Sequence, residues 1–331
     1  MARHQPAPAD TREISVAAEV LARVKAHVDT FVVGQQRLRE TLLIGLLTEG
    51  HLLLESVPGL AKTTAAASLA GAVSASFARI QCTPDLLPSD IIGTQIFNST
   101  TNEFETKLGP VHAHMVLLDE INRSSAKTQS AMLEAMQERQ TTIGGVHHRL
   151  PTPFLVMATQ NPIEQEGTHP LPEAQLDRFM LKDVLAYPTP EEELEILSRL
   201  DAGVYENSPE PACTVSELRS MQESARHIYI DPAISRYIVE LVWATRAAER
   251  VLGPRGTLIE AGASPRASIA FTRASRALAL IRGRNYVIPE DVKDLAHRVL
   301  AHRIVLTFEA IAEGITAAHL VTDILGRVRT P

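Results

Sequence analysis

The apolar positions of this chain follow two different periods. Up to about residue 187, short uninterrupted apolar runs alternate with stretches in which apolar residues recur every three or four positions. Uninterrupted runs are typical of strands buried on both faces, and the intervening period is that of helices. The pattern therefore predicts an α/β fold with a parallel sheet covered by helices. The predicted strands are 51–55, 77–82, 115–118 and 154–158, and the predicted helices are 13–26, 35–48, one that starts after Lys62, and 125–139.

After Tyr187 the period is almost entirely helical. Pro188-Thr-Pro190 marks the change, and Ser264-Pro265 supplies an N-cap followed by proline at the first position of a helix. Trp243 lies on an apolar helical stripe, which predicts that its indole belongs to the core. The predicted organisation is a disordered tail (1–12), an α/β domain (13–187) and a helical domain (188–331).

Composition narrows the class of protein. A chain of 331 residues has room for about two domains. Its net charge of −7 argues against wrapping duplex nucleic acid. Cys82 and Cys213 lack the clustered spacing of a zinc or disulfide framework, which favours a reducing compartment. No apolar run approaches the roughly 18 residues of a membrane span, and no signal-like segment opens the chain, so we expect a cytoplasmic protein.

The segment after the first predicted strand is a candidate phosphate-binding loop. It reads Ser56-Val-Pro-Gly59-Leu-Ala-Lys62-Thr63. In such a loop, backbone N–H groups surround phosphates, the lysine reaches the β- and γ-phosphates and the hydroxyl binds Mg²⁺. Ser56 and Ala61 stand where the general pattern has glycine. Taken alone, the segment is equally compatible with a Pro-Gly turn that precedes a helix.

Polar residues at the ends of two further strands favour the first interpretation. Asp119 and Glu120 follow an apolar strand, where one carboxylate can hold Mg²⁺ through water and the other can polarise a water molecule. Asn161 follows the next strand and could orient that water, although a capped strand end is the alternative. Arg178 and Arg266 are candidate cations for phosphate, and each alone could equally be part of a surface ion pair.

Together these segments resemble the MoxR family of AAA+ ATPases. The resemblance covers the chain from about Val32 to the C-terminus and implies a P-loop AAA+ domain with a five-stranded parallel sheet, followed by a small all-α lid. It also implies an insertion at 92–110 and a hairpin at 141–150. The matching segments are VPGLAKT (57–63), LLDEINR (117–123), KTQSAMLEAMQERQ (127–140), ATQNPIEQEGTHPLPEAQLDRF (158–179) and GASPRA (262–267).

The resemblance also implies a role for each candidate residue. Arg178 is expected to act on ATP bound by a neighbouring copy, and Arg266 to act within its own chain. Ser56 replaces the family's usual glycine, which bears on nucleotide affinity. The implied catalytic residues are Glu120, Asn161 (sensor 1), Arg178 (arginine finger) and Arg266 (sensor 2); the implied ATP contacts are Val33, Gly34, Gln35, Pro58, Gly59, Leu60, Ala61, Lys62, Thr63, Thr64 and Asp119; and Thr63 and Asp119 are the implied Mg²⁺ ligands, the latter through water.

The activity that the resemblance implies is ATP hydrolysis to ADP and phosphate by a ring, expected to be hexameric, that remodels proteins. A client protein and a partner with a von Willebrand factor A domain are the expected contacts. Two alternatives remain open. One is a nucleic-acid motor, against which the charge of −7 and the aromatic content of 4% both argue. The other is a regulatory module that binds ATP without hydrolysing it.

Overall fold

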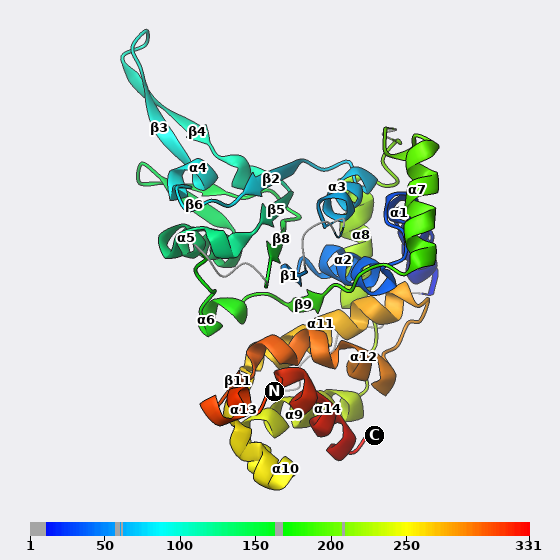
Figure 1. Ribbon diagram of the computed structural model, residues 1–331. Helices are drawn as coiled ribbons and strands as arrows, with labels where there is room; N and C mark the ends of the chain where they lie inside the picture. Colours follow the sequence, from blue (N-terminus) through cyan, green and yellow to red (C-terminus); the bar gives the residue numbers. More distant parts are fainter. Residues whose placement is uncertain (1–10, 57–59, 61, 163–167, 207–208) are drawn as a thin grey trace, which may run out of the picture.

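A five-stranded parallel sheet forms the centre of the computed structural model, which describes residues 11–56, 60, 62–162, 168–206 and 209–331. The strand order is β2-β5-β8-β1-β9, with every neighbouring pair parallel (Figure 1). The first four predicted strands are confirmed, and the fifth, β9, is the one that the resemblance alone supplied. The strands are β1 (Leu52–Glu55), β2 (Phe77–Gln81), β5 (Met115–Asp119), β8 (Leu155–Gln160) and β9 (Leu181–Val184).

Side chains of the central strands alternate between two apolar clusters. In β5, Met115 and Leu117 belong to one cluster, whereas Val116 and Leu118 belong to the other. Successive side chains of a strand point to opposite faces, so both faces of this sheet are buried. The first face is covered by α1 (Thr11–Phe31), α2 (Gln36–Thr48) and α3 (Lys62–Ala72), and the second by α4 (Pro88–Ile92) and α5 (Ala126–Glu138).

Two β-hairpins interrupt the alternation of strands and helices. The predicted insertion at 92–110 contains β3 (Gly93–Asn98) and β4 (Glu103–Leu108), which project away from the body of the molecule (Figure 1). The hairpin predicted at 141–150 forms from β6 (Gln140–Ile143) and β7 (Val146–Arg149). Its turn residues, Gly144 and Gly145, both have positive φ, which side chains disfavour.

The C-terminal part is helical, as predicted, apart from one short antiparallel pair, β10 (Ile259–Ala261) with β11 (Val305–Leu306). Two helices of this part pack on the first domain: Arg199 of α7 donates to the carbonyls of Asp29 and Thr30, and Gln222 of α8 donates to that of Leu46. The boundary at 187/188 stays a prediction. The helices are α7 (Pro190–Asp201), α8 (Val215–Arg226), α9 (Pro232–Arg246), α10 (Ala248–Leu252), α11 (Pro265–Ile281), α12 (Pro289–Leu300), α13 (Phe308–Ala312) and α14 (Ala317–Arg327).

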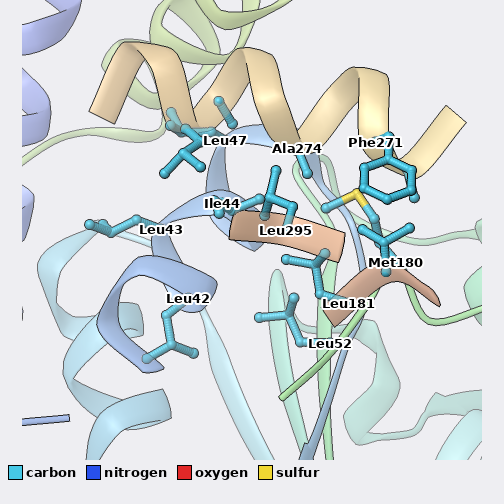
Figure 2. Close-up of a cluster of buried hydrophobic side chains, with 14 of the residues drawn as sticks. Leu42, Leu43, Ile44, Leu47, Leu52, Met180, Leu181, Phe271, Ala274 and Leu295 are labelled. Atoms are coloured by element: carbon cyan, nitrogen blue, oxygen red, sulfur yellow. The ribbon is translucent and has the colours of Figure 1, made fainter. Parts of the chain in front are cut away.

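The apolar core continues from the sheet into this helical part. Figure 2 shows side chains of α2, β1 and β9 packed against those of α11 and α12. This continuity fixes the position of α11 relative to the edge strand β9. The labelled residues are Leu42, Leu43, Ile44, Leu47, Leu52, Met180, Leu181, Phe271, Ala274 and Leu295.

Two expectations need correction, one about the N-terminal tail and one about Trp243. Residues 1–10 of the predicted tail lie outside the described residues, but Thr11 and Arg12 already belong to α1. Trp243 is not a core residue: it is 47% exposed, with the guanidinium of Arg250 5.9 Å from its ring centroid. An apolar stripe therefore overstated its burial. Within the described ranges, no helix has the length and apolarity needed to cross a bilayer.

Candidate active site

The polar candidates of the first domain gather at the carboxyl edge of the sheet. The strands β5, β8 and β1 are neighbours and end before Glu120, Asn161 and Ser56, respectively. The Ser56 N–H donates to the carbonyl of Gln160 at 3.2 Å, which extends the pairing of β1 with β8 beyond β1. Because neighbouring strands lie about 4.8 Å apart, Asn161 stands between the phosphate-loop segment and the two carboxylates. Asn161 is buried.

Thr159, which the sequence interpretation did not single out, positions both carboxylate residues. Its buried hydroxyl donates to Oδ1 of Asp119 at 2.8 Å and accepts the backbone N–H of Glu120 at 2.9 Å. Glu120 has φ 56°, a left-handed conformation that residues other than glycine seldom adopt. The hydrogen bond from its N–H to Thr159 helps to hold that conformation, which separates the directions of two consecutive carboxylates.

The other oxygens of these carboxylates contact β2, a strand to which the sequence gave no role. Arg79 donates to Oδ2 of Asp119 at 2.6 Å and to Gln81 at 3.2 Å. Gln81 in turn donates to Oε2 of Glu120 at 3.1 Å, and Arg123 lies 3.2 Å from the same oxygen. Both carboxylates thus accept hydrogen bonds. The guanidinium of Arg79 is a cation with which Mg²⁺ would compete for Asp119.

Lys62 begins α3 and is buried, with its Nζ 3.4 Å from the carbonyl of Ser56. Thr63 follows in the first turn, and its hydroxyl together with the Asp119 carboxylate supplies the oxygen ligands that Mg²⁺ prefers. Ser56 is not one of the five described non-glycine residues with positive φ, so serine causes no left-handed strain there. Three predicted contacts, Pro58, Gly59 and Ala61, lie outside the described residues.

A cavity of about 230 Å³ lies next to this segment. Four of the predicted ATP contacts line it: Val33, Gln35, Leu60 and Thr64. Its mainly apolar walls and its position beside α3 suit a flat heteroaromatic ring such as adenine. The other lining residues, which sequence reasoning missed, are Phe31, Val32, Leu38, Pro188, Ile196 and Tyr205.

The segment 33–35 is fixed by contacts with the start of α7. The amide of Gln35 donates to the carbonyl of Ala186 at 2.7 Å. Gly34 has φ 59°, a left-handed conformation that other residues adopt only with strain, and its Cα lies against the carboxylate of Glu192. The backbone conformation therefore explains why a glycine stands between two cavity-lining residues.

A buried thiol lies behind the carboxylates. Burial, together with the nearby charges of Asp119 and Glu120, raises the pKa of Cys82 to about 12. The N–H of Cys82 donates to the carbonyl of Asp119 at 2.9 Å. A thiol with this pKa stays protonated at neutral pH, so Cys82 packs and does not react.

Arg178 and Arg266 occupy the opposite edge of the sheet. Both line a cavity of about 260 Å³ with Gly50 and His51, which precede β1. The phosphate loop follows the other end of β1. Residues 52–56 separate His51 from that loop, and five extended residues span about 16 Å. Both arginines therefore lie at the amino edge.

Asp177 holds Arg266 near the sheet. Its carboxylate lies 3.7 Å from Arg266 and 2.8 Å from Arg303. The Nε of Arg178 is buried and has no hydrogen-bond partner within the described part of the chain. Arg266 thus lies with Arg178 at the amino edge and not with Lys62, a position that does not support the expected role of Arg266 within its own chain.

Two neutral histidines support this edge. The Nδ1 of His51 accepts the N–H of Val156 at 3.1 Å, so its Nε2 carries the proton donated to the carbonyl of Met136 at 3.2 Å. Burial lowers the pKa of His51 to about 4 and lowers that of His302 well below its usual value. The positive charge of the described lining of this cavity therefore comes from its arginines.

Comparison with known proteins agrees with the fold. A profile of the ATPase family associated with various cellular activities (AAA) matches residues 51–181, and one of the AAA lid domain matches residues 255–324. A crystal structure of a protein from Cytophaga hutchinsonii superposes with a TM-score of 0.90 at 45% identity, covering 97% of each chain. The chain is thus an AAA-type ATPase domain followed by a lid.

Near-full-length relatives narrow the family. The chain is 46% identical to Chaperone MoxR1 of Mycobacterium tuberculosis over 99% of its length and 87% of the relative's. It is 45% identical to the protein YeaC of Bacillus subtilis over 94% of this chain and 95% of that one. This chain belongs to the MoxR family of AAA+ ATPases.

Proposed function

We propose that this protein hydrolyses ATP at a site divided between two copies of the chain. The observation that carries the proposal is the separation of its charged groups. Lys62, Asp119 and Glu120 lie at the carboxyl edge of the sheet, whereas Arg178 and Arg266 lie at the amino edge. In a head-to-tail ring, the amino edge of one copy meets the carboxyl edge of the next, which completes the set.

Each residue has a task that follows from its position. Glu120 accepts the proton of the attacking water, and Asn161, on the strand between, orients that water. Lys62 balances charge on the β- and γ-phosphates, and bound Mg²⁺, held by Thr63 and Asp119, would neutralise more of it. Arg178 and Arg266 of the neighbouring copy stabilise the charge that develops on the outer oxygens in the transition state.

We further propose a hexameric ring in the cytoplasm that uses ATP to remodel a client protein, with a von Willebrand factor A domain protein as partner. The relative named Chaperone MoxR1 supports the chaperone-like role. The net charge of −7 supports a protein client over a nucleic acid.

Lys62→Ala tests the nucleotide site. Loss of a charge-assisted hydrogen bond to phosphate should weaken ATP binding by at least about 10-fold, measured by calorimetry. Lys25→Ala is the control. Lys25 is an exposed residue of α1, so this variant should bind ATP like the unchanged protein. Unchanged affinity in Lys62→Ala would contradict the phosphate-loop assignment.

The partner class is tested with the hydrolysis-impaired variant Glu120→Gln, used as bait in native lysate. Capture of a von Willebrand factor A domain protein, together with a response of the ATPase rate to that protein, is the expected result. Strong stimulation of phosphate release by single- or double-stranded DNA at physiological salt would instead favour the nucleic-acid motor.

A further inference from the structure

The outer face of α7 is apolar, and none of the described residues covers it. Leu194, Leu197 and Leu200 are 67%, 56% and 59% exposed. The opposite face is occupied, because Ile196 lines the cavity beside the phosphate loop and Arg199 binds the end of α1. Three exposed leucines on one short helix are more than scattered surface residues, and such stripes mark interaction sites.

Acidic residues flank this stripe. At 100° per residue, Glu191 and Glu193 lie on either side of Leu194 and Leu197. Both carboxylates are exposed and make no ion pair within the residues that the structure describes. The outer face of α7 is therefore an apolar stripe with an unpaired negative charge on either side of Leu194 and Leu197.

A face of α11 has the opposite character. Arg266, Ile269, Arg273 and Arg276 recur at intervals of three and four and so share one side of the helix. Ile269 is 52% exposed and lines the same cavity as Arg178 and Arg266. The arginine face of α11, defined by these four residues, is thus continuous with the amino-edge site.

Two arginines of this face are not neutralised. A second cavity, of about 440 Å³, is lined by Arg273 and Arg276 together with Glu49, Arg139 and Arg226. Glu49, the acid in that lining, is already paired with Arg139 and Arg226. Over the described chain, Arg273 and Arg276 make no ion pair, and the buried Nε of Arg276 has no hydrogen-bond partner.

We propose that the outer face of α7 in one copy docks on the arginine face of α11 in the next copy. Glu191 and Glu193 would then pair with Arg273 and Arg276, and the leucine stripe would cover Ile269. The proposal rests on the divided site proposed above: α7 flanks the nucleotide cavity, and Arg266 starts the arginine face, so a contact that delivers Arg266 to a neighbour's phosphate brings the two faces together.

Such a contact would set the register of the ring. Apolar area supplies attraction without direction, whereas paired charges reject wrong orientations and wrong partners. The arrangement is heterologous, since one copy contributes α7 and the other α11, which is the type of contact that closes into rings. The chemistry of the partner is therefore that of a second copy of this chain.

Paired charge reversal tests the contact. Glu191→Lys/Glu193→Lys and Arg273→Glu/Arg276→Glu should each raise the protein concentration for half-assembly by at least about 10-fold, because like charges then face each other. A chain that carries all four changes restores opposite charges and should assemble within about 3-fold of the unchanged protein. Assembly is measured by sedimentation velocity with a non-hydrolysable ATP analogue.

Matched controls come from α9. Arg236→Glu and Glu240→Lys change exposed residues of the same types, away from both faces, and should leave assembly unchanged. Binding of fluorescent ATP and far-UV circular dichroism check that each variant is folded. Reversals without effect, or a fourfold variant that fails to recover, would overturn the contact.

Failure of the contact and failure of the proposed function give different results. An unchanged protein that hydrolyses ATP, paired with a fourfold variant that does not recover assembly, contradicts only the docking of α7 on α11. An unchanged protein that assembles but releases no phosphate contradicts only the proposed hydrolysis. Recovery of assembly together with recovery of phosphate release supports both.

Discussion

The carboxyl and amino edges of one sheet differ in how their charges are satisfied. At the carboxyl edge, Asp119 and Glu120 are held by Thr159 and by side chains of β2. At the amino edge, Arg178 and Arg276 keep a buried Nε without a partner within the described residues. A folded chain seldom leaves buried donors unpaired, so the Nε groups of Arg178 and Arg276 are groups that the proposed contact with a second copy could satisfy.

The largest expected effect comes from changing one residue at each edge, in different copies of the chain. Arg178→Ala should lower turnover by about 10³–10⁵, the usual contribution of an arginine supplied by a neighbour. Mixing it with Lys62→Ala should restore part of the phosphate release, because some sites then pair an intact Lys62 with an intact Arg178. Phosphate release is measured at several mixing ratios. Confirmed mixed rings without recovered activity would place Arg178 within its own chain's site.

Glu120→Gln should separate binding from chemistry at the carboxyl edge. The amide keeps the hydrogen bond from Gln81 but cannot accept the proton of water, so turnover should fall by roughly 10²–10⁴ while ATP still binds. Single-turnover phosphate release and fluorescent-ATP titration measure the two quantities. Near-normal turnover would mean that another residue activates the water.

The amino edge should respond to acid through its histidines. His51 is neutral when folded, with a pKa of about 4, whereas the unfolded residue takes up a proton below its ordinary value of 6.5. The free energy of unfolding should therefore be highest above pH 6.5 and fall by about 3 kcal/mol as the pH is lowered to about 4. Urea denaturation at several pH values measures this.

His51→Gln isolates that contribution. Glutamine can accept from Val156 and donate to Met136 without titrating, so the variant should lose the part of the pH dependence that His51 contributes. An unchanged pH dependence would assign the acid sensitivity to other groups, with His302 the next to test.

The smallest expected effect concerns Arg79, whose guanidinium pairs with the carboxylate of Asp119, the proposed Mg²⁺ ligand. The guanidinium is about half exposed, so its pair with Asp119 should contribute modestly, and Arg79→Ala should lower the Mg²⁺ concentration for half-saturation by about 2- to 5-fold. Mg²⁺ titration of fluorescent-ATP binding measures it. Arg255→Ala removes an ion pair to Asp323 in the lid and should change nothing. Weaker Mg²⁺ binding in Arg79→Ala would mean that Arg79 positions Asp119 for the metal.

Sequence periodicity was sufficient for most of the sheet because β1, β5 and β8 are apolar up to their last one or two residues. It missed β9, whose Lys182 and Asp183 break the run: Asp183 is fully buried but hydrogen-bonded by Thr41, a contact made 142 residues away. No local pattern reports a partner at that distance. The prediction that Trp243 is buried was wrong for a different reason. An apolar stripe shows which face of a helix is apolar but not whether another element covers that face.

The candidate site also contains residues that the sequence could identify and residues that it could not. Motifs identified the residues that follow strands, because strand ends meet at one edge of a parallel sheet. Tyr205 and Ile196 carry no such signal, and they reach the cavity only because α7 packs against the end of α1. The direction in which Arg266 faces also depended on how α11 packs against α2 and β9, which the order of motifs does not encode.

The hairpin formed by β3 and β4 has a mechanical consequence. It is joined through α4 to β2, the strand whose Arg79 and Gln81 contact the carboxylates of Asp119 and Glu120, and it stands clear of the body (Figure 1). Six-residue strands make a lever arm of about 20 Å, so a tilt of about 10° at the base would carry the tip about 3.5 Å. Phe97 and Phe104, stacked edge to face at 5.3 Å on that arm, would sweep through that arc as one rigid unit.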